Sequence, residues 1–392
     1  MSMVKKKRII IFFLIVISVF NMFFVNIKAE GNEENQDVKE NLAQDLDFDE
    51  YIKTIDEHIK ESGLYDIDIN SITDELMTNS KLDYNSLLGK VLSVFSKEIL
   101  GALNGAISIF IIIIVMALIS SIELENKSDV TKIAHLACFL VIATITIATF
   151  IDVISMLKDV INALTTLMQT ISPFMMAILI ATGAITSTGI IQPLLLFVAS
   201  AIGFIITYIV IPFLSISVAF NVISSISENL RLNKLSKLFS SSSMWIVSVI
   251  LTIFLGILSL ETSLSSSVDS LAVKTTQTAV SNFVPVVGKF FSDSFETVVG
   301  ASKIIAKVGG GVAILAIVLI ALVPILKVLS IMIIYMLLGA VVEPICGSEQ
   351  INKFISGFAN IYKTILGILI GVTILFVISS GIIFNLANSV VK

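Results

Sequence analysis

The run AILAIVLIALVPILKVL, residues 313–329, is an apolar stretch interrupted only by Pro324 and Lys327. A second run of the same length, AIGFIITYIVIPFLSIS at residues 201–217, carries Pro212 at the corresponding place. The two prolines stand 112 residues apart. Stretches this apolar are typical of helices that cross a hydrocarbon core about 30 Å thick. The pair therefore predicts membrane-spanning helices that occur in duplicate.

The whole chain has the composition of a membrane protein. Of its 392 residues, 56% are hydrophobic and 14% are charged, whereas a soluble domain contains about 25% charged residues. Several uncharged runs are about 20 residues long, which is the length that a transmembrane helix needs. We therefore expect an all-α fold, a polytopic membrane helical bundle. Two leading transmembrane helices are predicted within residues 97–160, at about Glu98–Ser121 and Ile133–Ile154.

Beyond these leading helices the chain repeats itself. Pro173 and Pro285 also stand 112 residues apart. The further matched parts of the two copies are the polar stretches 232–239 and 351–358 and the spans Met244–Leu260 and Thr364–Ile383. Internal duplication is common among transport folds. We interpret residues 161–262 and 263–392 as two diverged membrane repeats that share one orientation.

The number of spans stays open between six, seven and eight. Thr170–Ala184 is apolar enough to cross a membrane, but its counterpart Asn282–Glu296 carries three charged side chains and suits a membrane interface. We therefore assign Thr170–Ala184 to a re-entrant or interfacial element. The stretches Phe213–Ser227 and Ile325–Ala340 could each add a further span.

Residues 1–29 have the layout of a secretory signal peptide. Lys5–Arg8 are basic, an apolar run follows to about Ile27, and Ala29 is a small residue before a cleavage point. Because Ile27 stands where a second small residue is expected, an uncleaved signal anchor is the alternative. In both cases the basic end stays in the cytoplasm and the chain from residue 30 onward is exported.

Residues 30–96 form an acidic exported segment with 17 acidic and 5 basic residues. Its beginning, Gly31–Glu40, is polar and lacks core-forming residues, and weak helical periodicity follows it. We predict two or three short amphipathic helices in this segment. They form either a solvated linker or a docking element for another exported protein.

Basic residues favour the same topology. The loops near residues 122–132, 221–243 and 343–363 contain lysines and one arginine. Cytoplasmic loops of membrane proteins carry an excess of such residues, so these three loops are predicted to be cytoplasmic. The stretch 263–308 is then an exported amphipathic loop within the second repeat.

Ionisable residues and helix breakers inside the spans are the candidates for function. Lys327 lies one turn after Pro324. Its amine either lines a polar pathway or extends along the helix to reach the membrane interface. Pro324 and its counterpart Pro212 are candidate hinges or parts of that pathway.

Glycines supply the remaining candidates. A triple glycine opens a span as a flexible hinge or a tight packing point, with an anion cradle as a third alternative; it consists of Gly309, Gly310 and Gly311. Small residues four apart let two helices approach closely in lipid. Such pairs are Gly101 with Gly105 and Gly367 with Gly371. We expect both pairs to lie at helix contacts.

The sequence carries no motif that points to an enzyme. It has no phosphate-binding loop of the form GxxxxGK[ST], so the chain itself does not resemble a nucleotide-driven motor. It also has neither a metal-ligand constellation nor a supported Ser/His/Asp arrangement. We expect no catalytic, cofactor-binding or metal-binding residues and no nucleic-acid partner.

An ordered series of segments links the chain to a known family. The series starts with the signal peptide and the acidic exported segment, and it continues with GIIQPL at 189–194, LTIFLG at 251–256 and NFVPVVGK at 282–289, followed by Phe295, Thr297, Val298 and Ser302. In order and spacing the series resembles the stage III sporulation protein AE family. The resemblance covers nearly the whole chain and is densest between about residues 160 and 380.

The resemblance implies a membrane subunit of the sporulation A–Q channel complex. That complex bridges the two membranes around the engulfed forespore, is similar to bacterial secretion systems and supports forespore development after engulfment. The implied location is the mother-cell membrane, where the subunit would form an export-apparatus or permease-like core. The implied partners are membrane lipid and the other subunits, including a separate secretion-type ATPase. The family supplies no catalytic residues to carry over.

Two other functions stay open. The duplicated, proline-broken spans also suit a stand-alone secondary transporter of a small solute. A structural scaffold of the complex, with no pathway of its own, is the third alternative. The sequence leaves the oligomeric state undecided, with a homo-oligomer among the possibilities.

Overall fold

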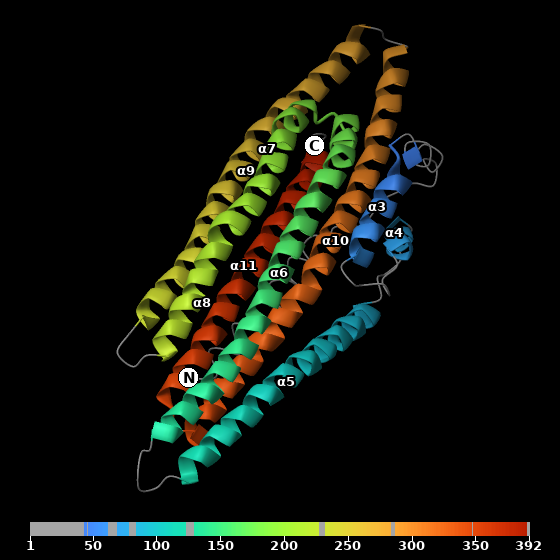
Figure 1. Cartoon of the computed structure of the whole chain (residues 1–392). Coiled ribbons are helices and arrows are strands. Elements are labelled where there is room, and N and C mark those ends of the chain that lie inside the picture. Colours follow the sequence, from blue (N-terminus) through green and yellow to red (C-terminus); the bar gives the residue numbers. More distant parts are fainter. Residues whose placement is uncertain are drawn as a thin grey trace.

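The structure, a computed structural model, is a bundle of long helices (Figure 1). It describes residues 43–44, 46–61, 69–77, 84–122, 129–226, 232–283, 287–346 and 348–389. Every element in these ranges is a helix, which confirms the predicted all-α fold. The signal peptide predicted for residues 1–29 lies outside the described residues.

Two short helices precede the long ones. In chain order the elements are α3 (Phe48–Glu61), α4 (Ile69–Met77), α5 (Tyr84–Ile122), α6 (Asp129–Ala181), α7 (Ile185–Ile205), the π-helix η2 (Ile206–Val210), α8 (Ile211–Ile226), α9 (Asn233–Phe283), α10 (Val287–Cys346) and α11 (Glu349–Ser389). Helices α7, η2 and α8 follow one another without a turn and act as one long helix.

Among the described residues, six helical stretches are long and apolar enough to cross a membrane. They lie in α5, α6, the α7–η2–α8 helix, α9, α10 and α11. The prediction of a multi-pass helical membrane protein is therefore confirmed, and the described residues supply six candidate spans, within the predicted range of six to eight. The two stretches that could have added a span continue α8 and α10 instead of forming separate helices.

The expected re-entrant element at Thr170–Ala184 is wrong, because α6 runs without a break to Ala181. Pro173 lies inside the helix and does not end it. Ile171, Met175 and Ile178 are almost completely buried in the bundle core. Burial of these side chains outweighs the tendency of the proline to break the helix. The charged stretch Asn282–Glu296, used as the counterpart in the second predicted repeat, was a poor guide to this segment.

The stretch 263–308, expected as a loop, is helical except at residues 284–286, which the structure does not describe. Helix α9 extends to Phe283, and α10 begins at Val287. Extending an existing helix avoids the cost of a new nucleus, and no glycine or proline interrupts residues 261–283 before Pro285. The described part of this connection is therefore helical, and its exported position stays a prediction.

Successive spans run antiparallel through the bundle. The C-terminal ends of α5, α8 and α10 all lie at one end of the bundle, the lower end in Figure 1, and those of α6 and α9 lie toward the other. The helix ends that flank the three loops predicted to be cytoplasmic therefore share one end. The α7–η2–α8 helix and α10 run in one direction, and α9 and α11 run in the opposite one. The two proposed copies thus have the same orientation.

Gly183 ends α6 and lets the chain turn back. Its φ of 88° lies in the left-handed region that favours glycine. The backbone N–H of Ala184 donates to the Leu179 carbonyl, and that of Gly183 donates to the Ile180 carbonyl, each at 2.9 Å. This pair of bonds is the Schellman motif, which satisfies the last carbonyls of a helix.

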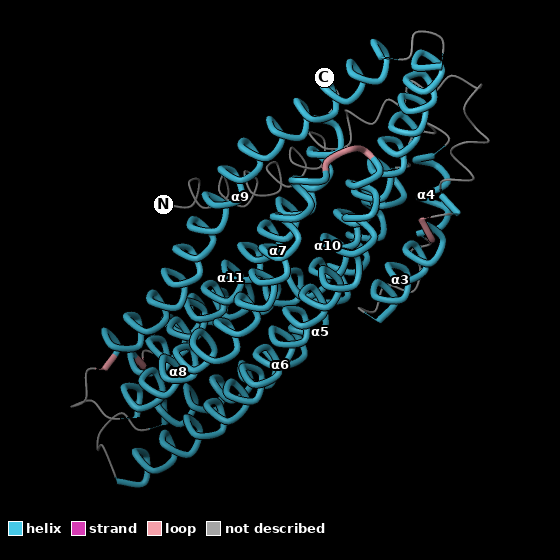
Figure 2. The backbone as a smooth tube through the Cα atoms, turned by 90° about the horizontal axis from the view of Figure 1, so that it is seen from above, coloured by secondary structure: helices cyan, strands magenta, loops and turns pink. Residues whose placement is uncertain are grey.

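Helices α10 and α11 form the centre of the bundle. In the most apolar part of each, 67% and 61% of residues are buried, against 22% in α5 and in α9. The two central helices pack along most of their length, and the other spans surround them, as the view from above shows (Figure 2). Aromatic rings of Phe354, Phe358 and Tyr362 follow one face of α11 and are fully buried.

Three helices are much longer than a membrane is thick. Helices α6, α9 and α10 contain 53, 51 and 60 residues. At a rise of about 1.5 Å per residue they are about 75 to 90 Å long, whereas the hydrocarbon core measures about 30 Å. The upper parts of α9 and α10 extend past the turn between α6 and α7 (Figure 1). These helices therefore project well beyond the bilayer.

Labelling with a membrane-impermeant maleimide tests the topology. In a chain with Cys138 and Cys346 replaced by serine, we expect Thr186→Cys to be labelled in intact cells, because this exposed position lies at the predicted outer end. Lys234→Cys and Lys353→Cys lie at the opposite end and should be labelled only after the membrane is opened. Labelling of the two lysine positions in intact cells would reverse the assigned orientation.

Candidate functional site

Pro212 produces the clearest irregularity in the membrane helices. Proline has no backbone N–H, and its ring clashes with the carbonyl four residues earlier. Immediately before it, residues Ile206–Val210 form a single π-helical turn between α7 and α8. Such wide turns inside α-helices occur frequently at functional sites. The helix thus has a point of weakness about midway along its length.

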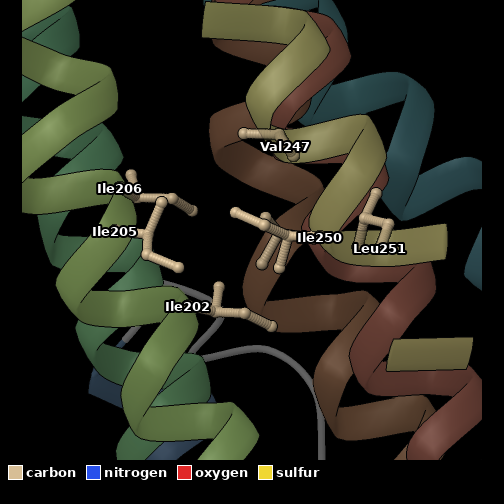
Figure 3. Close-up of a pocket in the computed structure, with 7 residues that line it drawn as sticks. Ile202, Ile205, Ile206, Val247, Ile250 and Leu251 are labelled. Carbon is tan, nitrogen blue, oxygen red and sulfur yellow. The ribbon is translucent and has the colours of Figure 1, made fainter. Parts of the chain in front are cut away.

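A small recess lies beside this π-helical turn (Figure 3). Figure 3 shows Ile202, Ile205 and Ile206 pointing across it toward Ile250 of α9. The remaining lining residues are Val247, Leu251 and Val372. Because all of these side chains are aliphatic, the recess offers no hydrogen bond to a polar solute, and it has room for no more than a small shift of a neighbouring side chain.

Pro324, the counterpart in the second copy, lies in a different setting. Helix α10 passes through it as a continuous α-helix, and the proline itself is buried. Lys327 is half-buried one turn later. Among the described residues no carboxylate lies within ion-pairing distance of its amine. The two prolines therefore have different surroundings. Pro212 follows a π-helical turn at the edge of the bundle, and Pro324 lies in an α-helix near its centre.

The triple glycine lies inside α10, where all three residues are buried. A Cβ atom at Gly309 would lie 3.4 to 3.5 Å from the rings of Phe174, Phe48 and Tyr51. Aromatic side chains therefore pack directly on the bare backbone of α10 at this point. The glycines lie within the helix and not at its start, because α10 begins 22 residues earlier at Val287. Their position at the opening of a membrane span stays a prediction.

Helix α3 brings two of these rings to α10. The Tyr51 hydroxyl donates a hydrogen bond of 2.7 Å to the Gly309 carbonyl and also lies 3.6 Å from Sδ of Met175. The Tyr51 ring stacks on Phe174 of α6, with centroids 3.9 Å apart and planes 18° apart. Burial raises the pKa of the Tyr51 phenol, so it remains a neutral donor. The segment predicted as linker or docking element thus docks on its own bundle.

The two GxxxG pairs differ in their surroundings. Nothing lies within 4 Å of a Cβ atom placed at Gly101 or Gly105, and both residues are exposed on the surface of α5. A Cβ atom at Gly367 would lie 2.8 Å from Cε of Met244, and one at Gly371 would lie 3.0 Å from Cδ1 of Leu251. The second pair lets α9 approach α11 closely, whereas the first makes no contact among the described residues.

A contact that the sequence did not reveal joins the two copies at the predicted cytoplasmic end. The Asn221 side-chain amide on α8 donates to the Phe354 carbonyl on α11 at 3.0 Å. A Cβ atom at Gly357 would lie only 2.1 Å from Oδ1 of Asn221. The glycine is therefore required for the amide to reach the backbone of α11. The sequence held one sign of this contact, because Asn221 is an amide side chain within the uncharged run 185–226.

Serines extend this contact to α9. The Ser217 hydroxyl donates to the Ser236 carbonyl, and the Ser236 hydroxyl donates to the Ser217 carbonyl, each at 2.8 Å. The hydroxyls of Ser240 and Thr364 lie 2.8 Å apart and join α9 to α11. Hydrogen bonds of this kind hold helices together in membranes at about 1 kcal/mol or less each. Helices α8, α9 and α11 therefore share a polar joint.

A group of hydroxyls lies around Tyr335 in the bundle core. Thr146 on α6, Tyr335 on α10 and Tyr362 on α11 are buried, and the Tyr335 hydroxyl interacts with those of Thr146, Thr149 and Tyr362. The rings of the two tyrosines meet edge to face, with centroids 5.1 Å apart. This group is therefore a polar spot where α6, α10 and α11 meet.

Replacing Gly357 with alanine tests the joint between the copies. The new methyl group would overlap the Asn221 amide, so we expect thermal unfolding of the full chain in detergent to show a loss of about 1 to 3 kcal/mol. The matched control is Gly101→Ala, whose methyl group meets nothing within 4 Å. It should be neutral or slightly stabilising. Equal stability of the two variants would contradict the close approach of α8 and α11.

Comparisons with known proteins relate most of the chain to one protein family. The sequence model of the family described as stage III sporulation protein AE matches residues 67–387. A curated relative, stage III sporulation protein AE of Bacillus subtilis (strain 168), is 25% identical over 227 residues. The aligned region covers 58% of this chain and 57% of the relative. No solved structure matches the chain significantly.

Proposed function

The chain belongs to the stage III sporulation protein AE family, and from this membership we propose that it is a membrane subunit of a channel or secretion-like complex that links mother cell and forespore. The family name places its role in stage III of sporulation. Its six apolar helical stretches make it a multi-pass membrane protein. The proposed location is the mother-cell membrane, with α3 and α4 on the side that faces the forespore.

The projection of α9 and α10 beyond the bilayer is the observation that best supports this proposal. These helices contain 51 and 60 residues, and a membrane crossing uses only about 20. The surplus extends on the side away from the predicted cytoplasmic loops (Figure 1). A protein that acts alone in one membrane has no need of such an extension, whereas a subunit that must meet proteins anchored in a second membrane does.

The surroundings of the candidate pathway residues favour this proposal over a stand-alone transporter. The recess beside the π-turn is lined only by aliphatic side chains. Lys327, the ionisable candidate, has no carboxylate partner among the described residues. A self-sufficient transporter needs convergent polar groups that bind its solute near the middle of the membrane. In the proposed function the pathway is completed by other subunits.

The proposed partners are the other subunits of the complex, and energy comes from a separate secretion-type ATPase. The absence of a phosphate-binding loop in the sequence is consistent with this division of labour. We propose no catalytic activity for this chain. Its contribution is mechanical. The central helices α10 and α11 hold the other spans in place, and α9 and α10 form the extension.

Shortening the α9–α10 extension tests the proposal. Deleting residues 270–283 together with residues 287–300 removes about four turns from each helix and leaves most of each apolar stretch in place. We expect the shortened protein to reach the membrane but to yield few heat-resistant spores, with arrest after engulfment, as in a deletion of the whole gene. Normal spore counts from either strain would contradict the proposed function.

A spacer variant separates reach from specific contact. Replacing the deleted residues with an unrelated helical hairpin of equal length restores the extension without its side chains. Restored sporulation would indicate that the extension acts as a spacer, and continued arrest would indicate that its own surface binds a partner. Membrane fractionation of each variant provides the control for expression and insertion.

A further inference from the structure

The triple glycine is the weakest helical stretch in α10. Each glycine in a helix interior costs about 1 kcal/mol relative to alanine, and three in succession concentrate this cost within one turn. Yet Gly309, Gly310 and Gly311 all lie within the continuous 60-residue helix. The helix must therefore be supported at this point by contacts with other elements.

Helix α3 supplies that support from outside the membrane spans. The Tyr51 hydroxyl donates to the Gly309 carbonyl at 2.7 Å. Its ring stacks on Phe174 of α6, and the ring of Phe48 approaches the same phenylalanine, with centroids 5.7 Å apart. One turn of α3 thus connects α6 with the glycine stretch of α10. The rings fit there because Gly309 has no side chain.

The rest of α3 is built to stay docked on this surface. Its apolar side chains, including Ile55 and Ile59, are fully buried against the bundle. Its outward face consists of polar side chains, namely those of Asp49, Glu50, Lys53 and Glu57, which are exposed. Because α3 has no second apolar face, its apolar side chains pack on elements of its own chain, namely α10, α6 and the neighbouring α4.

We propose that α3 is a clamp on the triple glycine of α10. While α3 is docked, it keeps α10 straight and fixes it to α6. When α3 is released, Gly309 loses the Phe48 and Tyr51 rings and the Tyr51 hydrogen bond and keeps only Phe174 of α6, and α10 bends at this point. The clamp thus couples a helix outside the membrane spans to the conformation of the most central membrane helix. A passive role of α3, in which it only covers the bundle surface, is the alternative.

Hydrogen exchange on the full chain in nanodiscs distinguishes the two roles. Amides of residues 313–315 bond to the carbonyls of the three glycines, so their exchange reports opening at the hinge. In Tyr51→Ala, which removes both the ring and the hydrogen bond, we expect exchange at residues 309–315 to rise at least tenfold. Exchange in the lower half of α10, around residues 330–340, should not change.

Two further variants match this one. Glu57→Ala alters only the outward face of α3 and should leave exchange at residues 309–315 unchanged. Adding Gly309→Ala to Tyr51→Ala places a methyl group where the contacts are ordinary van der Waals distances. It strengthens the helix by about 1 kcal/mol, so exchange at the hinge should fall about fivefold compared with Tyr51→Ala alone.

The decisive result is the location of the change. Faster exchange in α3 with no change at residues 309–315 would overturn the clamp and leave α3 a passive cover. If Tyr51→Ala accelerates exchange throughout the bundle, the comparison moves to Tyr51→Phe, which keeps the ring and loses only the hydrogen bond. No local rise in that variant would also overturn the proposal. This readout does not depend on sporulation, so it stands apart from the proposed function.

Discussion

The packing of α10 against α11 is the interaction on which the rest of the structure depends. Both helices are largely buried along their apolar stretches, and the other spans lie around them. In lipid, helices associate through close packing and hydrogen bonds between them, because the acyl chains are as apolar as the side chains. The buried aromatic rings of α11 and the glycines that admit α8 and α9 to its surface meet this requirement.

The two segments predicted to be copies run in the same direction through the bundle but differ in local chemistry. Pro212 accompanies a π-helical turn and a small aliphatic recess, whereas Pro324 lies in a continuous α-helix at the centre. The difference follows from position, because a central helix packed on all sides has little room for a wide turn. Bending the α7–η2–α8 helix would require only that aliphatic side chains rearrange. Bending α10 would require that the residues packed on it, such as those of α3, first move away.

The sequence predicted the parts of the fold that depend on composition and period. The apolar runs located the six spans, and the lysine-containing loops fall at one end of the bundle. It failed where burial outweighs a local signal, as at Pro173 inside α6. It also could not tell Gly101 from Gly367, because equal spacing does not reveal which helix, if any, packs on each pair. The amphipathic pattern of α3 predicted a helix, but not the surface that it covers.

Helices α9 and α10 are expected to leave the membrane as one continuous extension of the bundle. A cryo-EM reconstruction of the full chain in a lipid nanodisc would show whether they do. We expect a helical pair that stands well beyond one face of the disc, with the C-terminal ends of α5, α8 and α10 at the opposite face. Density for α9 and α10 that ends at the disc surface would contradict it.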